Sequence, residues 1–399
     1  NLKLQLSWIK IIILSMASIR RTDLLKKIRQ SLKQSRVTAL IGPRQVGKTT
    51  LSKEVIRLSK IKPVNFFDLE DPTDFNLLEN AKLTLESLTG LIIIDEIQRR
   101  PELFKYLRVK ADSMGKDTKV LILGSSSRDL IENASESLAG RIEYIEVPGL
   151  SIQETKNTEK LFERGSYPLS FTARTVEQSY SWRKSYAQSY IERDLKTLGI
   201  DLPAQSLRRL MEMLAGYHGQ IFNSSEIGKS MGFSHTTARK YVDILVATFL
   251  LRELKPWNEQ ILQRQVKQPK IYFRDSGLLN YFLNIKSHDE LVRNPKLGSL
   301  WEGFALEETI KSIGAEASDL YFWSLHQNGE LDLFWKNGSK RIGFEFKYSD
   351  APQISSSMNK ALELLKLDHL YVVYPGSKKA QLDKKITLIP IDRVLELHF

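Results

Sequence analysis

The residues with the clearest chemical potential form a glycine-rich run that ends in lysine and threonine. Residues 42–49 match G-x-x-x-x-G-K-[ST], the phosphate-binding loop of nucleotide hydrolases. Glycines let the backbone turn its N–H groups toward an anion, and a following helix adds partial positive charge. We expect Lys48 to reach the β- and γ-phosphates and the Thr49 hydroxyl to hold Mg²⁺. The predicted nucleotide-binding residues are Gly42, Pro43, Arg44, Gln45, Val46, Gly47, Lys48, Thr49 and Thr50.

A pair of carboxylates, Asp95 and Glu96, follows the apolar run 91–94. A buried strand would deliver both side chains to its exposed tip. Asp95 is then expected to hold Mg²⁺ directly or through water, and Glu96 to polarise the attacking water as a general base. The alternative is a solvated strand end with no chemistry. Beside a phosphate loop, a glutamate in the second position favours hydrolysis over phosphoryl transfer to a small acceptor.

Two more residues are candidates for the same site. Ser125, followed by Ser126 and Ser127, ends another apolar run and could contact the γ-phosphate or orient the water. The alternative for these serines is a helix N-cap. Arg141 carries a guanidinium that suits the spread charge of a transferring phosphoryl group, within the chain or across a subunit boundary. The alternative for Arg141 is a structural salt bridge, and the inter-subunit role would require a homo-oligomer.

These groups need a sheet whose strands all end at one edge. Continuous apolar runs alternate with helical patterns, which predicts an α/β fold with a parallel sheet covered on both faces. Ligands of such sheets bind at the carboxyl ends of the strands, where Lys48, Asp95 and Ser125 fall. The expected strands are residues 37–41, 64–67, 91–94, 120–123 and 142–147, with helices over 50–59 and 101–113.

Several of these segments together resemble a prokaryotic AAA+ ATPase family whose members carry a C-terminal domain long labelled as of unknown function. The segments that show this resemblance are residues 42–50, 92–101, 123–126, 138–141 and 148–154. The family usually has Pro-Leu-Ser where this chain reads Pro-Gly-Leu-Ser, so Gly149 is a departure. The resemblance covers nearly the whole chain from Met16. It implies an AAA+ core with an additional strand and ATP as the nucleotide, and it supplies no substrate.

The middle of the chain is expected to be helical. In the basic connector 154–205, aromatic residues recur at helical spacing, and core packing is favoured over stacking on nucleic-acid bases. They are Tyr180, Trp182, Tyr186 and Tyr190.

Residues 206–256 show the order helix, helix, glycine turn, helix, strand, which predicts a winged helix-turn-helix within a domain at 206–290. Asn223 is expected to cap the second helix, with Glu226 as its capping-box partner, and Ser234 to cap the third. The third helix would present polar and basic side chains to DNA phosphates and base edges, although a protein-docking module is the alternative. The predicted DNA-binding residues are Lys229, His235, Thr236, Thr237, Arg239 and Lys240.

Residues 291–399 show the order helix, three strands, helix, strand, which resembles the restriction-endonuclease fold. Asp332 and the pair Glu345 and Lys347 match the PD-(D/E)xK pattern of that family. Alternation along a strand places Glu345 and Lys347 on one face, where Asp332 can meet them. Asp332, Glu345 and Glu302 would hold Mg²⁺, and Lys347 would activate water. The alternatives are an ion pair on a strand face and an inactive fold kept for DNA binding.

Composition limits the remaining possibilities. The 399 residues allow two or three domains, and the absence of cysteine excludes disulfides, thiolate zinc sites and cysteine nucleophiles. It also favours the reducing cytoplasm. The net charge of +12 favours an acidic partner, nucleic acid before membrane. The apolar run 8–14 is too short to span a bilayer, and residues 1–15 are expected to be an extension upstream of Met16.

The sequence therefore predicts a cytoplasmic, oligomeric AAA+ ATPase that acts on DNA. The alternative is an ATP-dependent switch that docks a protein partner and cuts no DNA. The predicted domains are an ATPase domain at 16–153, a helical connector at 154–205, a winged helix at 206–290 and a nuclease-like domain at 291–399.

Overall fold

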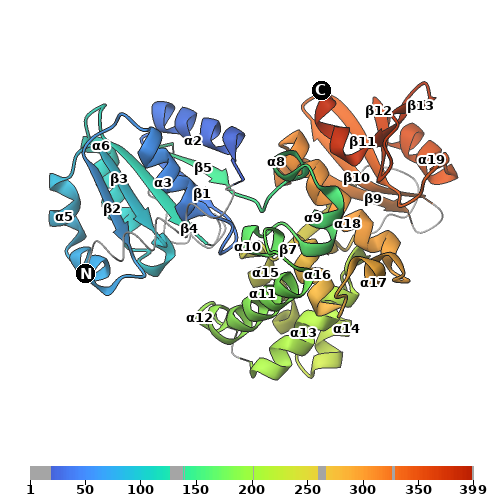
Figure 1. Ribbon diagram of the computed structural model, residues 1–399, viewed down its shortest axis with the longest axis horizontal. Helices are drawn as coiled ribbons and strands as arrows, with labels where there is room; N and C mark the ends of the chain where they lie inside the picture. The colour runs from blue at the N-terminus through green and yellow to red at the C-terminus, as the bar shows by residue number, and fades with distance from the viewer. Residues whose placement is uncertain are drawn as a thin grey trace.

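The computed structural model describes residues 19–125, 138, 140–200, 202–258, 267–325 and 329–397. The chain forms two lobes, which are joined by the segment that leaves strand β5 (Figure 1). None of the helices in the described ranges has the length and apolar character needed to cross a membrane. The predicted extension at 1–15 lies outside the described residues, as do Ser126 and Ser127.

The first lobe is a five-stranded parallel sheet in the order β2-β3-β4-β1-β5. The predicted parallel sheet is therefore confirmed. Strand β4 lies between the strand that precedes the glycine loop and the strand that ends at Asp95, as expected for an additional-strand core. The strands are β1 Val37–Ile41, β2 Val64–Asp68, β3 Leu91–Asp95, β4 Lys119–Gly124 and β5 Ile142–Glu146.

Helices cover both faces of this sheet, and its central strands β1, β3 and β4 are buried at every residue except Lys119. Ile93 packs with the cluster that includes α3, whereas Ile92 and Ile94 pack with α5 and α6 on the opposite face. Helix α3 begins at Lys48, earlier than the predicted Thr50, because Gly47 adopts a left-handed conformation as its N-cap. The helices are α2 Thr22–Gln34, α3 Lys48–Leu58, α4 Pro72–Leu77, α5 Ala81–Ser87 and α6 Leu103–Ser113.

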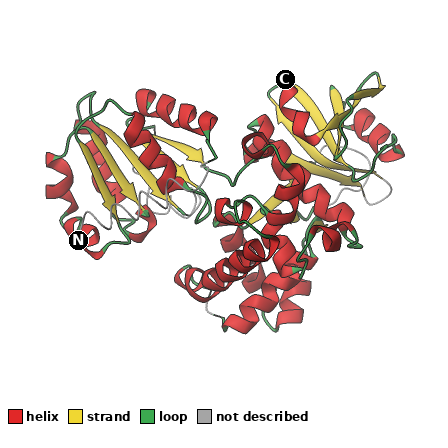
Figure 2. Ribbon diagram, viewed as in Figure 1, coloured by secondary structure: helices red, strands yellow, loops and turns green. Residues whose placement is uncertain are grey.

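The second lobe combines a helical layer with a large sheet (Figure 2). Between α11 and α12, residues Tyr190–Asp194 wind as a short π-helix. The core interpretation of the aromatic stripe is confirmed for Tyr186 and Tyr190, which are buried, whereas Tyr180 and Trp182 are partly exposed and pack against the same core. The helices are α8 Ile152–Thr155, α9 Thr158–Arg164, α10 Pro168–Phe171, α11 Val176–Ser189, α12 Leu195–Thr197, α13 Ala204–Gly216, α14 Ser224–Met231, α15 His235–Ala247, α16 Ser276–Phe282, α17 His288–Val292, α18 Leu297–Ile313 and α19 Ser356–Leu364.

Both expected N-caps of the middle region are present, but the Glu226 side chain bonds Tyr217 and does not complete the expected capping box. Asn223 accepts backbone N–H bonds at the start of α14, and Ser234 accepts one from Thr237 at the start of α15. The apolar face of α15, which includes Ala238 and Leu245, is buried as predicted. Strand β8 was not expected from the sequence, and it pairs with both β6 and β7.

One sheet runs through the predicted boundary between residues 290 and 291. Its nine strands follow the order β13-β14-β12-β11-β10-β9-β7-β8-β6, and the joint is a short parallel pairing of β7 with β9. The five strands predicted after residue 300 are confirmed, and β13 is an addition. The strands are β6 Gln220–Ile221, β7 Leu251–Pro256, β8 Lys270–Phe273, β9 Leu320–Leu325, β10 Gly329–Asn337, β11 Lys340–Phe346, β12 His369–Tyr374, β13 Ala380–Asp383 and β14 Ile386–Pro390.

Candidate functional site

The glycine-rich loop follows β1 at the carboxyl edge of the first sheet. Gly42 has a φ of 153°, and a Cβ there would lie 2.3 Å from the carbonyl oxygen of Val147. No other residue type fits this close approach of two backbones. The non-glycine Gln45 also has a positive φ of 61°. The loop is thus folded into a turn whose shape the local sequence and its neighbour β5 both impose.

Lys48 is buried at the start of α3, with its ammonium directed back into the loop. Its Nζ donates to the carbonyl oxygens of Gly42 and Pro43, each at 2.8 Å. Burial lowers the pKa of Lys48 to about 8, although the charges of Glu96 and Asp95 oppose the shift. An anion in the loop would supply the negative charge that this buried ammonium lacks.

Thr49 and Asp95 are in direct contact. The Thr49 hydroxyl donates to Oδ2 of Asp95 at 2.7 Å, across the strand that separates β1 from β3. Asp95 is buried, and burial raises the pKa of its carboxyl group. A hydroxyl and a carboxylate at this spacing, beside a turn of N–H groups, are oxygen ligands suited to Mg²⁺ on a bound triphosphate. The donor set therefore fits the predicted cofactor.

Glu96 is held in a network that the sequence did not reveal. It adopts a left-handed backbone conformation, with a φ of 54°. The Ser125 hydroxyl donates to Oε2 of Glu96 at 3.2 Å, and the Gln98 amide donates both to that oxygen and to the Ser125 hydroxyl. The structure thus brings Glu96 and Ser125 together and adds Gln98. The one available signal was the position of Gln98 shortly after the acidic pair.

Arg44 and Arg141 occupy different edges of the sheet. Arg44 pairs with Glu70 at 2.6 Å and with Asp194 of the second lobe, so it lies at the loop as predicted. Arg141 precedes β5, and its carbonyl oxygen accepts from Val37 at the amino edge. Its guanidinium contacts Asp112 at 2.5 Å. The structure therefore does not bring Arg141 to Lys48 of the same chain, and a role across a subunit boundary stays a prediction.

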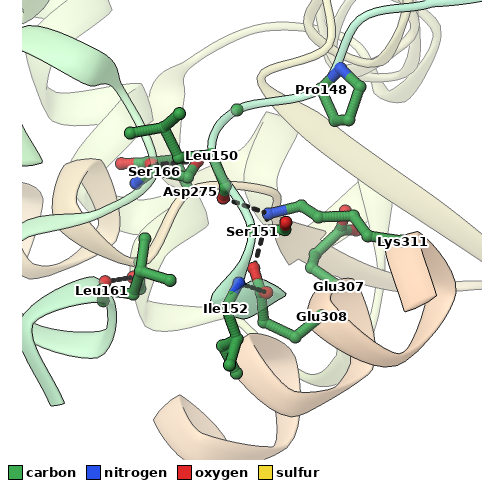
Figure 3. A network of polar contacts seen from close by, with 12 residues as sticks. Pro148, Leu150, Ser151, Ile152, Leu161, Ser166, Asp275, Glu307, Glu308 and Lys311 are labelled. Carbon is green, nitrogen blue, oxygen red and sulfur yellow. Dashed lines mark hydrogen bonds and ion pairs between the residues drawn. The ribbon is translucent and has the colours of Figure 1, made fainter. Parts of the chain in front are cut away.

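Side chains from both lobes contact the segment that joins them. Arg21 of the first lobe donates to the carbonyl oxygens of Pro148 and Gly149 and pairs with Glu154 at 2.7 Å. Figure 3 shows the contacts from α18: Lys311 donates to the Leu150 carbonyl oxygen at 3.1 Å, and Glu308 accepts from the Ile152 N–H at 2.8 Å. The two lobes are consequently linked by buried polar contacts.

A second ion-pair group lies beside this segment. Buried Glu307 accepts from Arg252 at 3.0 Å and from Arg274 at 3.4 Å, and Arg274 also pairs with Glu146 at the end of β5. Burial raises the pKa of Glu307, but the two guanidinium groups outweigh it and lower the value to about 2. Glu307 is therefore a permanent buried charge that joins β5, β7 and the end of β8.

The predicted DNA-binding residues lie on α14 and α15. Lys229, His235, Thr236 and Lys240 are exposed. Arg239 instead forms ion pairs with Asp243 at 2.7 Å and with Glu253. The Thr237 hydroxyl contacts the Ser234 hydroxyl at 2.9 Å. The exposed positive charge of this surface thus comes from the two lysines.

The C-terminal carboxylates gather at β10, β11 and α18. Asp332 and Glu345 are buried, and Oε1 of Glu345 pairs with Lys347 at 2.7 Å. Burial raises the pKa of Asp332 well above its usual value, and the charges of Glu345 and Glu302 add to the effect. Oε2 of Glu345 is buried without a hydrogen-bond partner. The two acids and Lys347 are therefore neighbours, as predicted.

Glu302 does not complete the expected trio. Its Oε1 accepts from the Tyr272 hydroxyl at 2.6 Å and from Lys270 at 3.3 Å, both on the unexpected strand β8. Within the described ranges, no three histidine, cysteine, aspartate or glutamate side chains are placed to share a metal ion. Lys270 and Tyr272 are residues of this cluster that the sequence did not reveal.

Comparison with known families agrees with the geometry of the first lobe. Residues 34–156 match the family model described as "AAA domain". Residues 155–289 and 297–394 match two families, each described as a "Domain of unknown function" (DUF8612 and DUF4143). With the parallel sheet, the loop and the acidic pair, the first match identifies residues 34–156 as an AAA-type P-loop ATPase domain.

The particular family follows from two curated relatives. "Uncharacterized protein Rv2008c" of Mycobacterium tuberculosis and "Uncharacterized protein Mb2031c" of Mycobacterium bovis are each 44% identical to the chain over 379 residues. The match covers 94% of this chain and 85% of each relative. The chain belongs to the family of these mycobacterial proteins.

Two solved structures are more distantly similar. A Walker-type ATPase of Pyrococcus abyssi is 14% identical, with a TM-score of 0.46 over 67% of this chain and 96% of its own. A mutant form of Thermotoga maritima RuvB is 17% identical, with a TM-score of 0.30 over 59% of this chain and 90% of its own. Both are too distant to bear on how the lobes of this chain work together.

Proposed function

We propose that the first lobe binds and hydrolyses ATP with Mg²⁺. The contact between the Thr49 hydroxyl and Asp95 carries this proposal, because it places the loop and the acidic strand end at one point. Bound Mg²⁺ would neutralise charge on the β- and γ-phosphates. Thr49 and Asp95 would hold the ion, and Lys48 would contact the phosphates once it leaves the carbonyl oxygens of Gly42 and Pro43.

Glu96 is the proposed general base. Its carboxylate lies at the carboxyl edge of the sheet beside Ser125, where a water could be oriented for in-line attack on the γ-phosphate. Gln98 and Ser125 would fix the orientation of that carboxylate. Hydrolysis, rather than transfer to a second substrate, is supported by the presence of a base next to the Mg²⁺ ligand.

The test of this function uses two variants and a nucleotide-binding assay. Lys48→Ala is expected to abolish binding of a fluorescent ATP analogue, whereas Glu96→Gln is expected to bind the analogue normally and to lose turnover. Normal hydrolysis by Glu96→Gln would disprove the assignment of the base. Failure of the unaltered protein to bind ATP with Mg²⁺ would disprove the function itself.

We further propose that the protein acts on DNA in the cytoplasm. The net charge of +12 and the exposed Lys229, His235 and Lys240 support contact with a phosphate backbone. DNA should then raise the ATPase rate, and the stimulation should fall with added salt because counterions compete for the phosphates. A rate indifferent to single-stranded, duplex and branched DNA would favour the rival function, an ATP-dependent switch that docks a protein.

Arg141 supports a further proposal, that the protein works as a homo-oligomer. It lies on the edge of the sheet opposite the nucleotide site, so it could reach only the nucleotide of a neighbouring subunit. Mixing Lys48→Ala protein with Arg141→Ala protein would test this arrangement. An active mixed assembly is expected, because one interface would keep both residues intact.

A second candidate function is metal-dependent cleavage of DNA by the C-terminal region. The buried, unpartnered Oε2 of Glu345 beside Asp332 favours it, because a carboxylate oxygen in that setting requires a cation or a donor. Asp332 and Glu345 would hold the metal, and Lys347 would position water. Lys347→Ala is expected to abolish cleavage with Mg²⁺ or Mn²⁺ and to leave the ATPase rate unchanged. Intact cleavage in that variant would overturn this candidate.

A further inference from the structure

A lysine from the middle region enters the acidic cluster of the C-terminal region. Lys270 lies on β8, and only 4% of its surface is exposed. Its Nζ lies 2.5 Å from Oε1 of Glu330 on β10 and 3.3 Å from Oε1 of Glu302 on α18. Buried lysines are uncommon and need compensation of their charge. Here one compensating carboxylate, Glu330, lies on the strand that carries Asp332, and the charge of the other, Glu302, acts on Asp332.

The neighbours of Lys270 keep its ammonium in place. Tyr272, also on β8, donates to the same Glu302 oxygen at 2.6 Å, and the ring of Phe322 lies 5.5 Å from the ammonium. Burial by itself lowers the pKa of Lys270, but the surrounding Tyr272, Glu302 and Asp332 outweigh it and raise the pKa well above its usual value. Lys270 is consequently a fixed positive charge.

Two lysines contact the carboxylates of this cluster, and one carboxylate oxygen in it has no hydrogen-bond partner. Lys347 contacts Oε1 of Glu345 on one side, and Lys270 contacts Glu302 on the other. Between them, Asp332 feels the charges of Glu345, Glu302 and both lysines. Oε2 of Glu345 is buried and has no hydrogen-bond partner. The cluster thus already contains a cation, the Lys270 ammonium held by Glu302 and Glu330, near a carboxylate oxygen that has no partner.

We propose that the ammonium of Lys270 is the built-in cation of this cluster, so that Lys270 and a divalent metal ion are alternative occupants. While Lys270 holds Glu302, the three carboxylates cannot converge on one ion. This inference rests on the proposed metal-binding role of Asp332 and Glu345, and it is independent of the ATPase.

The experiment measures binding of Mn²⁺ alone to the full-length chain without nucleotide, from the electron paramagnetic resonance signal of the free ion. Every protein carries Asp95→Asn, so that the ATPase site loses its carboxylate metal ligand. Lys270→Met removes the charge and keeps the stem, and Lys270→Arg keeps the charge. Because a positive charge a few ångströms away repels a divalent ion, Lys270→Met should lower the Mn²⁺ dissociation constant at least ~10-fold.

The controls separate this inference from the metal site itself. Lys270→Arg should bind Mn²⁺ as weakly as the parent, and Lys270→Met combined with Glu345→Gln should lose the gain. Equal, tight binding by the parent and Lys270→Met would overturn the inference and leave the metal site standing. If neither the parent nor Lys270→Met binds Mn²⁺, both the inference and the proposed metal site are wrong. If circular dichroism shows that Lys270→Met is unfolded, Lys270→Gln removes the same charge while keeping a donor for Glu302.

Discussion

Arg44 of the phosphate-binding loop is ion-paired with Asp194 of the second lobe, although 150 residues separate them in the chain. Asp194 ends the π-helical turn Tyr190–Asp194. The other guanidinium nitrogen contacts Glu70, which follows β2 in the first lobe. The loop expected to hold phosphate is therefore attached to the helical layer of the other lobe through one side chain.

Releasing Arg44 from Asp194 should strengthen nucleotide binding. In Asp194→Asn the guanidinium keeps one acidic partner, Glu70, and the loop gains net positive charge. Partly exposed ion pairs contribute up to about 1 kcal/mol, so the dissociation constant of a fluorescent ATP analogue should fall about fivefold or less. Glu70→Gln is the matched control and should give a similar gain. Weaker binding in Asp194→Asn would mean that Asp194 positions Arg44 for the phosphates.

Removing the Gln98 amide should slow hydrolysis without weakening ATP binding. The amide contacts both Glu96 and Ser125, so Gln98→Ala leaves the proposed base less well oriented. Misplacement of a reacting group by about 1 Å costs up to ~100-fold in rate, and we expect a loss of kcat of about tenfold. Ser125→Ala should lose less, because Gln98 still holds Glu96. A rise in KM with unchanged kcat would show that Gln98 serves binding instead.

The nucleotide site was predictable because its signals are local. The spacing of Gly42, Gly47 and Lys48 sets a loop by itself, and the apolar run before Asp95 shows that the carboxylate ends a buried strand. Parallel strands then bring both to one sheet edge. The contact between Thr49 and Asp95 follows from these rules without knowledge of any other part of the chain.

The residues that the sequence did not reveal contact partners that are far away in the chain. Asp194 lies in a helix with no motif, and its partner Arg44 is fixed only when the lobes pack. Lys270 sits in a four-residue strand whose pairing with β6 and β7 depends on tertiary contacts. Short strands carry little periodicity, so neither β8 nor its approach to Glu302 could be predicted.

Replacing Glu307 should destabilise the second lobe strongly. Glu307→Gln leaves the buried Arg252 without its charge partner and leaves Arg274 with Glu146 alone, and breaking such a group typically costs about 3–5 kcal/mol. The free energy of unfolding in urea measures the loss. Glu212→Gln is the matched control: Glu212 pairs with Arg208 on an exposed helix face, so its loss should be below about 1 kcal/mol. Equal losses would contradict a buried structural role for Glu307.

The same residue predicts an acid dependence of stability. The pKa of Glu307 is lowered to about 2 in the folded protein, below the ordinary glutamate value of the unfolded chain. Its stabilisation is therefore present above that ordinary value and is lost as the pH falls toward 2. As the pH falls between those limits, the free energy of unfolding should decrease more steeply for the unaltered protein than for Glu307→Gln. If the free energies of unfolding of the two proteins decrease in parallel, a group other than Glu307 controls the loss of stability at acid pH.

ATP binding should weaken as the pH rises through about 8, because burial lowers the pKa of Lys48 to that value in the free protein. A triphosphate beside the ammonium stabilises its charged form, so the bound state keeps the proton to higher pH. Binding then takes up a proton above about pH 8, and the dissociation constant should rise by about tenfold per pH unit there. Below that pH, Lys48 is already charged and its contribution should be flat. Lys48→Arg stays charged throughout, so any affinity that it retains should show no such rise. A rise of the same size in Lys48→Arg would assign the titration to a group other than Lys48.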